Sequence, residues 1–132
     1  MQVFVPELTF EASVGCLDPS RLGNQIYREG KTLIMGGWPN HPCSKAWADY
    51  RVALAEYCLC GLRELTKRGR HYATHYDFFQ KIRDSGPLIM PHWWNDVEVH
   101  DSHKSNLIRK KPEWYVKYWP HTPNNLPYKW PV

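Results

Sequence analysis

A long apolar stripe constrains the fold more than any other feature of this sequence. Between Trp47 and Leu65, apolar side chains recur every three or four residues, the spacing of one face of an α-helix. Pro42 suits the first turn of such a helix, and Gly69 follows two basic residues that favour a helix end. The pattern therefore predicts one continuous helix between Pro42 and Gly69, with its apolar face in the core.

Shorter helical patterns flank this segment on both sides. Asp18 can cap a helix that begins with a proline and ends at the two glycines of residues 36–37. Further helices are expected over residues 75–84 and 102–110, and a short last helix opens at Pro112. The prediction is an all-α fold.

The two ends of the chain lack helical periodicity. Residues 1–15 contain a proline and predict an extended, ordered N-terminal arm. Residues 120–132 carry four prolines and predict an extended tail, rich in proline and aromatic residues, that packs Tyr128 and Trp130 against the body. Because no linker or repeat interrupts the chain, we expect one compact helical domain over residues 1–132.

Composition narrows the class of protein. The 132 residues carry a formal net charge of +4 with seven Trp, eight Tyr and four Phe, a combination that suits a nucleic-acid partner. Mean hydropathy is −0.61, and no apolar run approaches the roughly 20 residues of a membrane span. The first residues do not form a signal peptide. We expect a monomer without a membrane partner, located in the cytoplasm, or in the host cytoplasm if a phage encodes it.

The four cysteines do not form a metal motif. No Cys-x-x-Cys pair occurs, and reduced, buried thiols are expected. The weaker alternative is a zinc site built from Cys43 and several histidines. His71 and His75 have the i,i+4 spacing of some zinc pairs, but the His-Glu-x-x-His motif is absent. No metal and no cofactor are expected.

The segment RLGNQIYREGK is a candidate for chemistry. It surrounds one acid, Glu29, with Arg21, Arg28 and Lys31, and on a helix Gln25 shares a face with this acid. Two interpretations remain open. The segment is either a solvated helix face with ion pairs or a catalytic acid on a phosphate-binding surface.

A second candidate region spans residues 100–119. Its cations can bind phosphates, and its aromatic side chains can stack on unpaired bases. The alternative is that about half of these aromatic side chains belong to the core.

Four motifs in order resemble one known family. The segments RLGNQIYREGKTL, GWPNHPCSKAW, KRG at the end of the long helix, and SHKSNLIRKKPEWYVKYWP resemble the pyrimidine-dimer DNA glycosylase family of phages and bacteria. The likeness is strongest to a short subfamily that opens with an MQTF-like sequence and contains RLGKQR. It extends over nearly the whole chain.

The resemblance implies an all-α fold in which the N-terminal arm passes between helices. It also implies a glycosylase with AP-lyase activity on double-stranded DNA, in which an N-terminal α-amine attacks the sugar C1′ and a helix glutamate assists. Glu29 matches that glutamate, and Met1 supplies the amine. The residues expected to contact DNA are Gln2, Arg21, Gln25, Arg28, Lys31, His41, His103, Lys104, Asn106, Arg109, Lys110, Trp114, Tyr115 and Tyr118.

Two departures from the family pattern modify these expectations. Gln2 stands where the prototype exposes a small threonine, so we expect Met1 to be retained as the nucleophile, displaced by one residue. One extra residue lies between Leu22 and Glu29, and it is expected to rotate Glu29 away from the site. The alternatives are a monofunctional enzyme in which Glu29 activates water, a relative acting on hypermodified phage bases, or a non-catalytic nucleic-acid-binding module.

Overall fold

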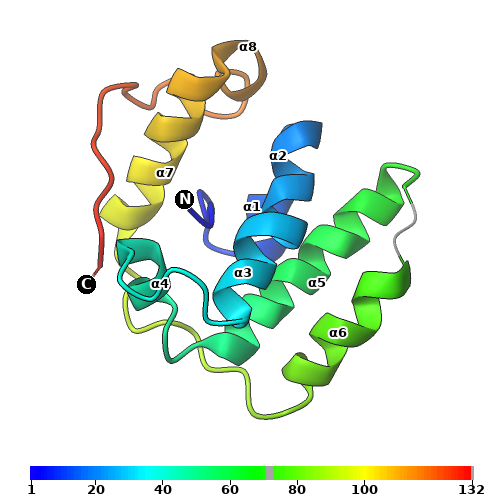
Figure 1. Ribbon diagram of the computed structural model, residues 1–132. Coiled ribbons are helices and arrows are strands. Elements are labelled where there is room, and N and C mark those ends of the chain that lie inside the picture. The colour runs from blue at the N-terminus through cyan, green and yellow to red at the C-terminus, as the bar shows by residue number, and fades with distance from the viewer. Residues whose placement is uncertain (71–72, 132) are drawn as a thin grey trace.

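Helices dominate the structure (Figure 1). The computed structural model describes residues 1–70 and 73–131, those at 73 and 74 by their backbone alone. The elements are α1 (Phe10–Gly15), α2 (Pro19–Asn24), the π-helix η1 (Gln25–Gly30), α3 (Lys31–Ile34), α4 (Pro42–Ala46), α5 (Arg51–Lys67), α6 (Ala73–Arg83), α7 (Val97–Lys110) and α8 (Pro112–Tyr115). No strand occurs in the described part of the chain, so the all-α prediction is confirmed.

The helix α5 is the centre of the core. Its buried face includes Leu54, Tyr57, Leu62 and Leu65, and it packs against α1, η1 and α6. The predicted helix over 75–84 is observed as α6. Phe79 of α6 has no exposed surface and Ile82 is also buried, as their spacing indicated.

The prediction of one helix between Pro42 and Gly69 is wrong, because non-helical residues separate α4 from α5. Tyr50, the residue before α5, has a non-helical backbone with φ −124° and ψ 42°. The carbonyl oxygen of Ala46, at the end of α4, accepts a 2.9 Å hydrogen bond from the indole N–H of Trp93. The Ala46 carbonyl thus bonds to a distant side chain in place of a backbone N–H of a continuing helix. The local spacing of apolar residues gives no sign of this long-range bond.

The N-terminal arm is shorter than predicted. Only residues 1–6 are extended, because Phe10–Gly15 forms α1. The Thr9 hydroxyl accepts a 3.1 Å hydrogen bond from the Ala12 N–H and caps this helix. Phe10 and Val14 bury its inner face.

The helix expected over 102–110 begins five residues earlier, at Val97. The Asp96 carboxylate accepts a 3.1 Å bond from the Glu98 N–H and starts α7. At the other end of the chain the tail is extended, as predicted, and packs Tyr128 and Trp130 against the core.

All four cysteines are free and buried, in agreement with the prediction. Burial raises the pKa of Cys16 to about 12 and that of Cys43 to about 11, so both are thiols at neutral pH. His71, one member of the alternative zinc pair, lies outside the described residues. Among the described helices, none is long and apolar enough to cross a membrane.

Candidate active site

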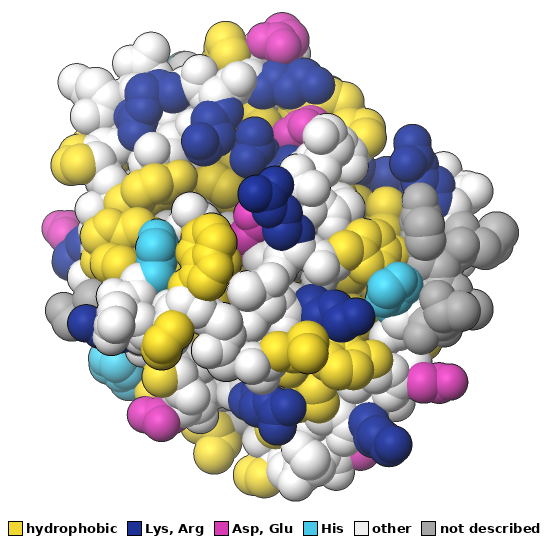
Figure 2. Space-filling view, in the orientation of Figure 1, with side chains coloured by type: hydrophobic (Ala, Val, Ile, Leu, Met, Phe, Trp, Pro, Cys, Tyr) yellow, Lys and Arg dark blue, Asp and Glu magenta, His cyan; other side chains and the backbone are white. Residues whose placement is uncertain are grey.

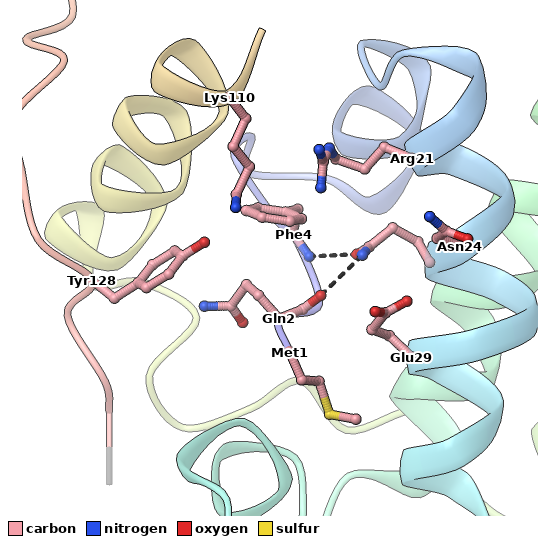
Figure 3. A pocket seen from close by; sticks show the side chains of 9 residues that line it. Met1, Gln2, Phe4, Arg21, Asn24, Glu29, Lys110 and Tyr128 are labelled. Atoms are coloured by element: carbon pink, nitrogen blue, oxygen red, sulfur yellow. Dashed lines mark hydrogen bonds between the residues drawn. The ribbon is translucent and has the colours of Figure 1, made fainter.

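A pocket of about 250 Å³ opens where the N-terminal arm meets the helices on either side of it (Figure 3). Its walls come from the arm, from the continuous run of α2 and η1, from the end of α7 and from the tail. The lining residues are Met1, Gln2, Phe4, Arg21, Asn24, Gln25, Glu29, Lys110 and Tyr128. The candidate segment around Glu29 and Lys110 of the second candidate region therefore meet at one site.

Gln25 fixes the arm on one side of this pocket. Its side-chain oxygen accepts a 2.6 Å hydrogen bond from the Phe4 N–H, and its amide nitrogen donates a 2.9 Å bond to the Gln2 carbonyl (Figure 3). The Tyr57 hydroxyl donates 2.8 Å to the carbonyl of Phe4. An extended segment inside a helical protein has no sheet partner, and these side chains satisfy its backbone groups instead.

Two histidines of α7 fix the arm on the other side. His103 accepts a 2.9 Å bond from the Val5 N–H through Nδ1, and Nδ1 of His100 lies 2.6 Å from the Val5 carbonyl oxygen. Burial lowers the pKa of His103 to about 3, so the ring is neutral and Nδ1 can accept. The arm passes between helices, as the resemblance implied, and the N-terminus is held at the pocket.

Glu29 lines the pocket with an unused acceptor. Its Oε2 is buried and has no hydrogen-bond partner among the described residues, and the same is true of Nε2 of Gln2. Buried polar atoms are nearly always paired in native proteins, so two unpaired atoms in one pocket are characteristic of a site that binds a polar ligand.

Two charges of the pocket lining influence the buried thiol of Cys43. Burial is the largest influence on this thiol and raises its pKa; the positive N-terminal amine lowers it, whereas the Glu29 carboxylate raises it. Burial, and after it the same amine, lower the pKa of His41. The α-amine of Met1 and the carboxylate of Glu29 thus both act on Cys43.

The π-helix η1 sets the direction of Glu29. A π-turn closes its hydrogen bonds to the fifth residue and so holds roughly one more residue than an α-turn. Arg21, Gln25 and Glu29 all line the pocket, whereas Arg28 is exposed outside its lining. Glu29 thus lines the same pocket as Met1, and the π-turn that carries it holds one residue more than an α-turn would.

Gly30 permits this turn. A Cβ at this position would lie 2.4 Å from the Cys58 sulfur and 2.7 Å from the Gln25 carbonyl oxygen. The absence of a side chain therefore allows η1 to pack on α5.

The cations predicted to contact DNA divide into two groups. Arg21 and Lys110 line the pocket and extend toward each other above Phe4 (Figure 3). Other cations contact side chains outside the pocket. The Lys104 Nζ lies 3.7 Å from the Asp101 Oδ1, and the Lys31 Nζ lies 5.2 Å from the centre of the Phe78 ring. Figure 2 shows Lys and Arg side chains spread over this face around a recessed acidic side chain.

Several predicted DNA contacts are corrected by their burial. Tyr115 has no exposed surface, and its hydroxyl is bonded to the Asp18 N–H and carboxylate. His103 and Gln25 are buried against the arm, where they hold it in place. Asn106 is buried under the tail. Tyr115, His103 and Asn106 lie outside the pocket lining and support the site from behind, whereas Gln25 both holds the arm and lines the pocket.

Arg109 is also used within the protein. Its guanidinium donates 2.6 Å to the Asn124 carbonyl and 2.9 Å to the Leu126 carbonyl, and so ties the tail to α7. Of the remaining aromatic candidates, Trp114 is half-buried and donates 2.8 Å to the Cys16 carbonyl, whereas Tyr118 is exposed.

Tyr128 and Asn24 of the pocket lining were not predicted as site residues. Asn24 lies within the motif around Glu29, whereas Tyr128 belongs to no motif and reaches the pocket only because the tail returns along α7 (Figure 1).

Comparison with known proteins decides the family. A family model described as pyrimidine dimer DNA glycosylase matches residues 1–80. The chain belongs to this family. The match includes the arm, η1 and α5, and so the part of the pocket that holds Glu29, whereas α7 and the tail lie beyond it. No curated protein and no solved structure matches the chain. Membership of the pyrimidine dimer DNA glycosylase family indicates an enzyme of the glycosylase type, with DNA as its substrate.

Proposed function

We propose that the chain excises damaged or modified pyrimidines, such as UV-induced dimers, from duplex DNA, and that the Met1–Glu29 pocket is its active site. The observation that carries the proposal is the unpaired, buried Glu29 oxygen in a pocket that Met1 also lines. Residues 1–132 act as one domain in this proposal, and as a monomer.

The α-amine of Met1 is the proposed nucleophile. A primary amine without its proton has a free electron pair and can attack an electrophilic sugar carbon. Its nitrogen forms a bond to C1′ while the N-glycosidic bond breaks, and the base leaves with the electron pair and takes up a proton. Loss of the amine protons and opening of the sugar give an imine, which permits β-elimination of the 3′ phosphate.

Glu29 stabilises the positive charge that develops at the sugar. A carboxylate beside an oxocarbenium-like transition state has this role in glycoside hydrolysis. Arg21 and Lys110 would hold phosphates at the mouth of the pocket. If the amine does not attack, the same carboxylate can instead activate water, giving base release without strand cleavage.

The experiment is borohydride trapping on UV-irradiated duplex. We expect a covalent protein–DNA adduct, whose mass spectrum places the link on the N-terminal residue, and its loss after selective N-terminal acetylation. Base release without an adduct would indicate that Glu29 activates water and that the amine does not attack. A dimerised base stays joined to its neighbour after cleavage, so the readout is the N-glycosidic bond itself, and intact bonds in the UV-damaged duplex would contradict the proposed substrate. Duplexes with hypermodified pyrimidines then test the alternative substrate.

A further inference from the structure

Trp38 lies in a strained and exposed position. Its φ is +53°, and among the described non-glycine residues it alone has a positive φ. Its exposed fraction is 54%. A bulky residue in the left-handed region costs roughly 1–2 kcal/mol compared with a relaxed conformation. Strained backbone is found most often where a binding or catalytic role requires it.

The loop that carries Trp38 is held rigidly. The Gly37 N–H donates 2.9 Å to the Thr32 carbonyl, and the His41 N–H donates 3.1 Å to the Trp38 carbonyl. The Ser44 hydroxyl donates 3.3 Å to the Gly37 carbonyl. These bonds join the end of α3 to the start of α4 and present the indole to solvent.

A continuous series of aromatic rings leads from Trp38 to the pocket. Successive ring centres lie 6.2 Å apart from Trp38 to His41, 5.7 Å from His41 to Trp130, and 5.2 Å from Trp130 to Tyr128. Tyr128 lines the pocket, and His41, Trp130 and Tyr128 are half-buried. Figure 2 shows a histidine among hydrophobic side chains beside the recessed acid. We call these four residues the aromatic track.

We propose that the aromatic track receives unpaired nucleobases of a DNA strand whose sugar lies in the Met1–Glu29 pocket. The inference rests on the proposed function, because it takes DNA as the ligand of that pocket. It adds a second contact that reads the faces of bases, in contrast to the cations, which read phosphates.

The occupant follows from chemistry next to the track. Arg21 and Lys110 at the pocket mouth favour an anionic backbone. Flat, half-exposed rings favour flat, weakly hydrated ligands, and each base stacked on an aromatic side chain contributes about 1–3 kcal/mol. Only an unpaired base offers both of its faces, so a fully paired duplex cannot use the track.

The test measures DNA affinity in the Glu29→Gln protein, so that chemistry does not intervene. Fluorescence anisotropy compares a duplex carrying one extra, unpaired nucleotide with the matched, fully paired duplex. We expect tighter binding to the unpaired form. We expect Trp38→Gly to lose about 10-fold on that form and little on the paired form. Trp38→Phe, which retains a ring, should keep most of the preference.

Two controls separate stacking from folding. Glycine tolerates positive φ, so Trp38→Gly should leave the thermal midpoint within about 4 °C of the parent. Ile89 is also an exposed apolar residue, at 60%, and lies outside the track, so Ile89→Ala should change neither affinity.

An equal loss on both duplexes, or no preference in the parent protein, would overturn the inference. Its failure is distinguishable from failure of the proposed function. Absence of base release by the unmutated enzyme contradicts the chemistry, whereas the affinity ratio alone judges the track.

Discussion

The side-chain oxygen of Gln25 accepts a 2.6 Å hydrogen bond from the backbone N–H of Phe4, 21 residues earlier in the chain. With the amide bond to the Gln2 carbonyl, this contact ties the N-terminal arm to the helix that carries Glu29. One amide side chain therefore holds the arm on the Glu29 side of the pocket, opposite the two histidines of α7.

Gln25→Ala should release the arm. The change leaves the buried Phe4 N–H and Gln2 carbonyl without this partner, and each such group costs about 1–3 kcal/mol. We expect the free energy of unfolding to fall by roughly 2–4 kcal/mol in chemical denaturation. Asn24→Ala, at an exposed position of the same run, is the matched control and should have little effect. A stability unchanged by Gln25→Ala would mean that the arm is held by α7 alone.

Gly30→Ala should disturb the direction of Glu29. The added Cβ would meet the Cys58 sulfur and the Gln25 carbonyl at distances that no packed structure tolerates. We expect a loss of several kcal/mol on unfolding and a loss of base release. Gly23 is the control, because a Cβ there meets nothing within 4 Å. Gly23→Ala should be neutral or stabilise by up to about 1 kcal/mol. If both variants behave alike, the close packing of η1 is not required.

Glu29→Gln should lower base release by at least about 100-fold, because the amide cannot stabilise a developing positive charge or accept a proton. Affinity for the same damaged duplex, measured by anisotropy, should be retained. Glu113→Gln, at an exposed position of α8, is the control. Full activity of Glu29→Gln would assign the chemistry to another carboxylate.

Acid should destabilise the protein through His103. Burial lowers its pKa in the folded protein to about 3, compared with 6.5 for the unperturbed side chain. As pH falls, the unfolded state takes up the proton first. The stability is therefore complete above about pH 6.5 and declines toward pH 3, by up to about 1.4 kcal/mol per pH unit from this group. Denaturant titrations from pH 7 to 4 measure the slope. His103→Asn should reduce it, whereas exposed His121→Gln should not.

Lys110→Ala should weaken DNA binding and lower the slope of log affinity against log salt by about 1, since Lys110 lines the pocket. Lys81→Ala, at an exposed position of α6, should leave the slope unchanged. Arg109→Ala should act mainly on thermal stability, because its guanidinium holds the tail carbonyls. A lower salt slope for Arg109→Ala than for Lys110→Ala would reverse these assignments.

The sequence predicts the helical class and the region of the site because both depend on local pattern. The apolar spacing of α5 and α6 and the motif around Glu29 are local features. The break at Tyr50 and the burial of Tyr115 depend on distant partners, Trp93 and Asp18. The spacing of Gln25 and Glu29 correctly predicts that they share one face, since both line the pocket, but it does not reveal that the turn between them is a π-turn.

The pocket joins the N-terminal arm to the tail, since Met1 and Tyr128 both line it. These two residues lie far apart in the sequence, with all of the helices between them. Bringing such distant segments together costs loop-closure entropy that local helix contacts do not offset. We therefore expect this pocket to form late in folding, after the helices around α5 have packed.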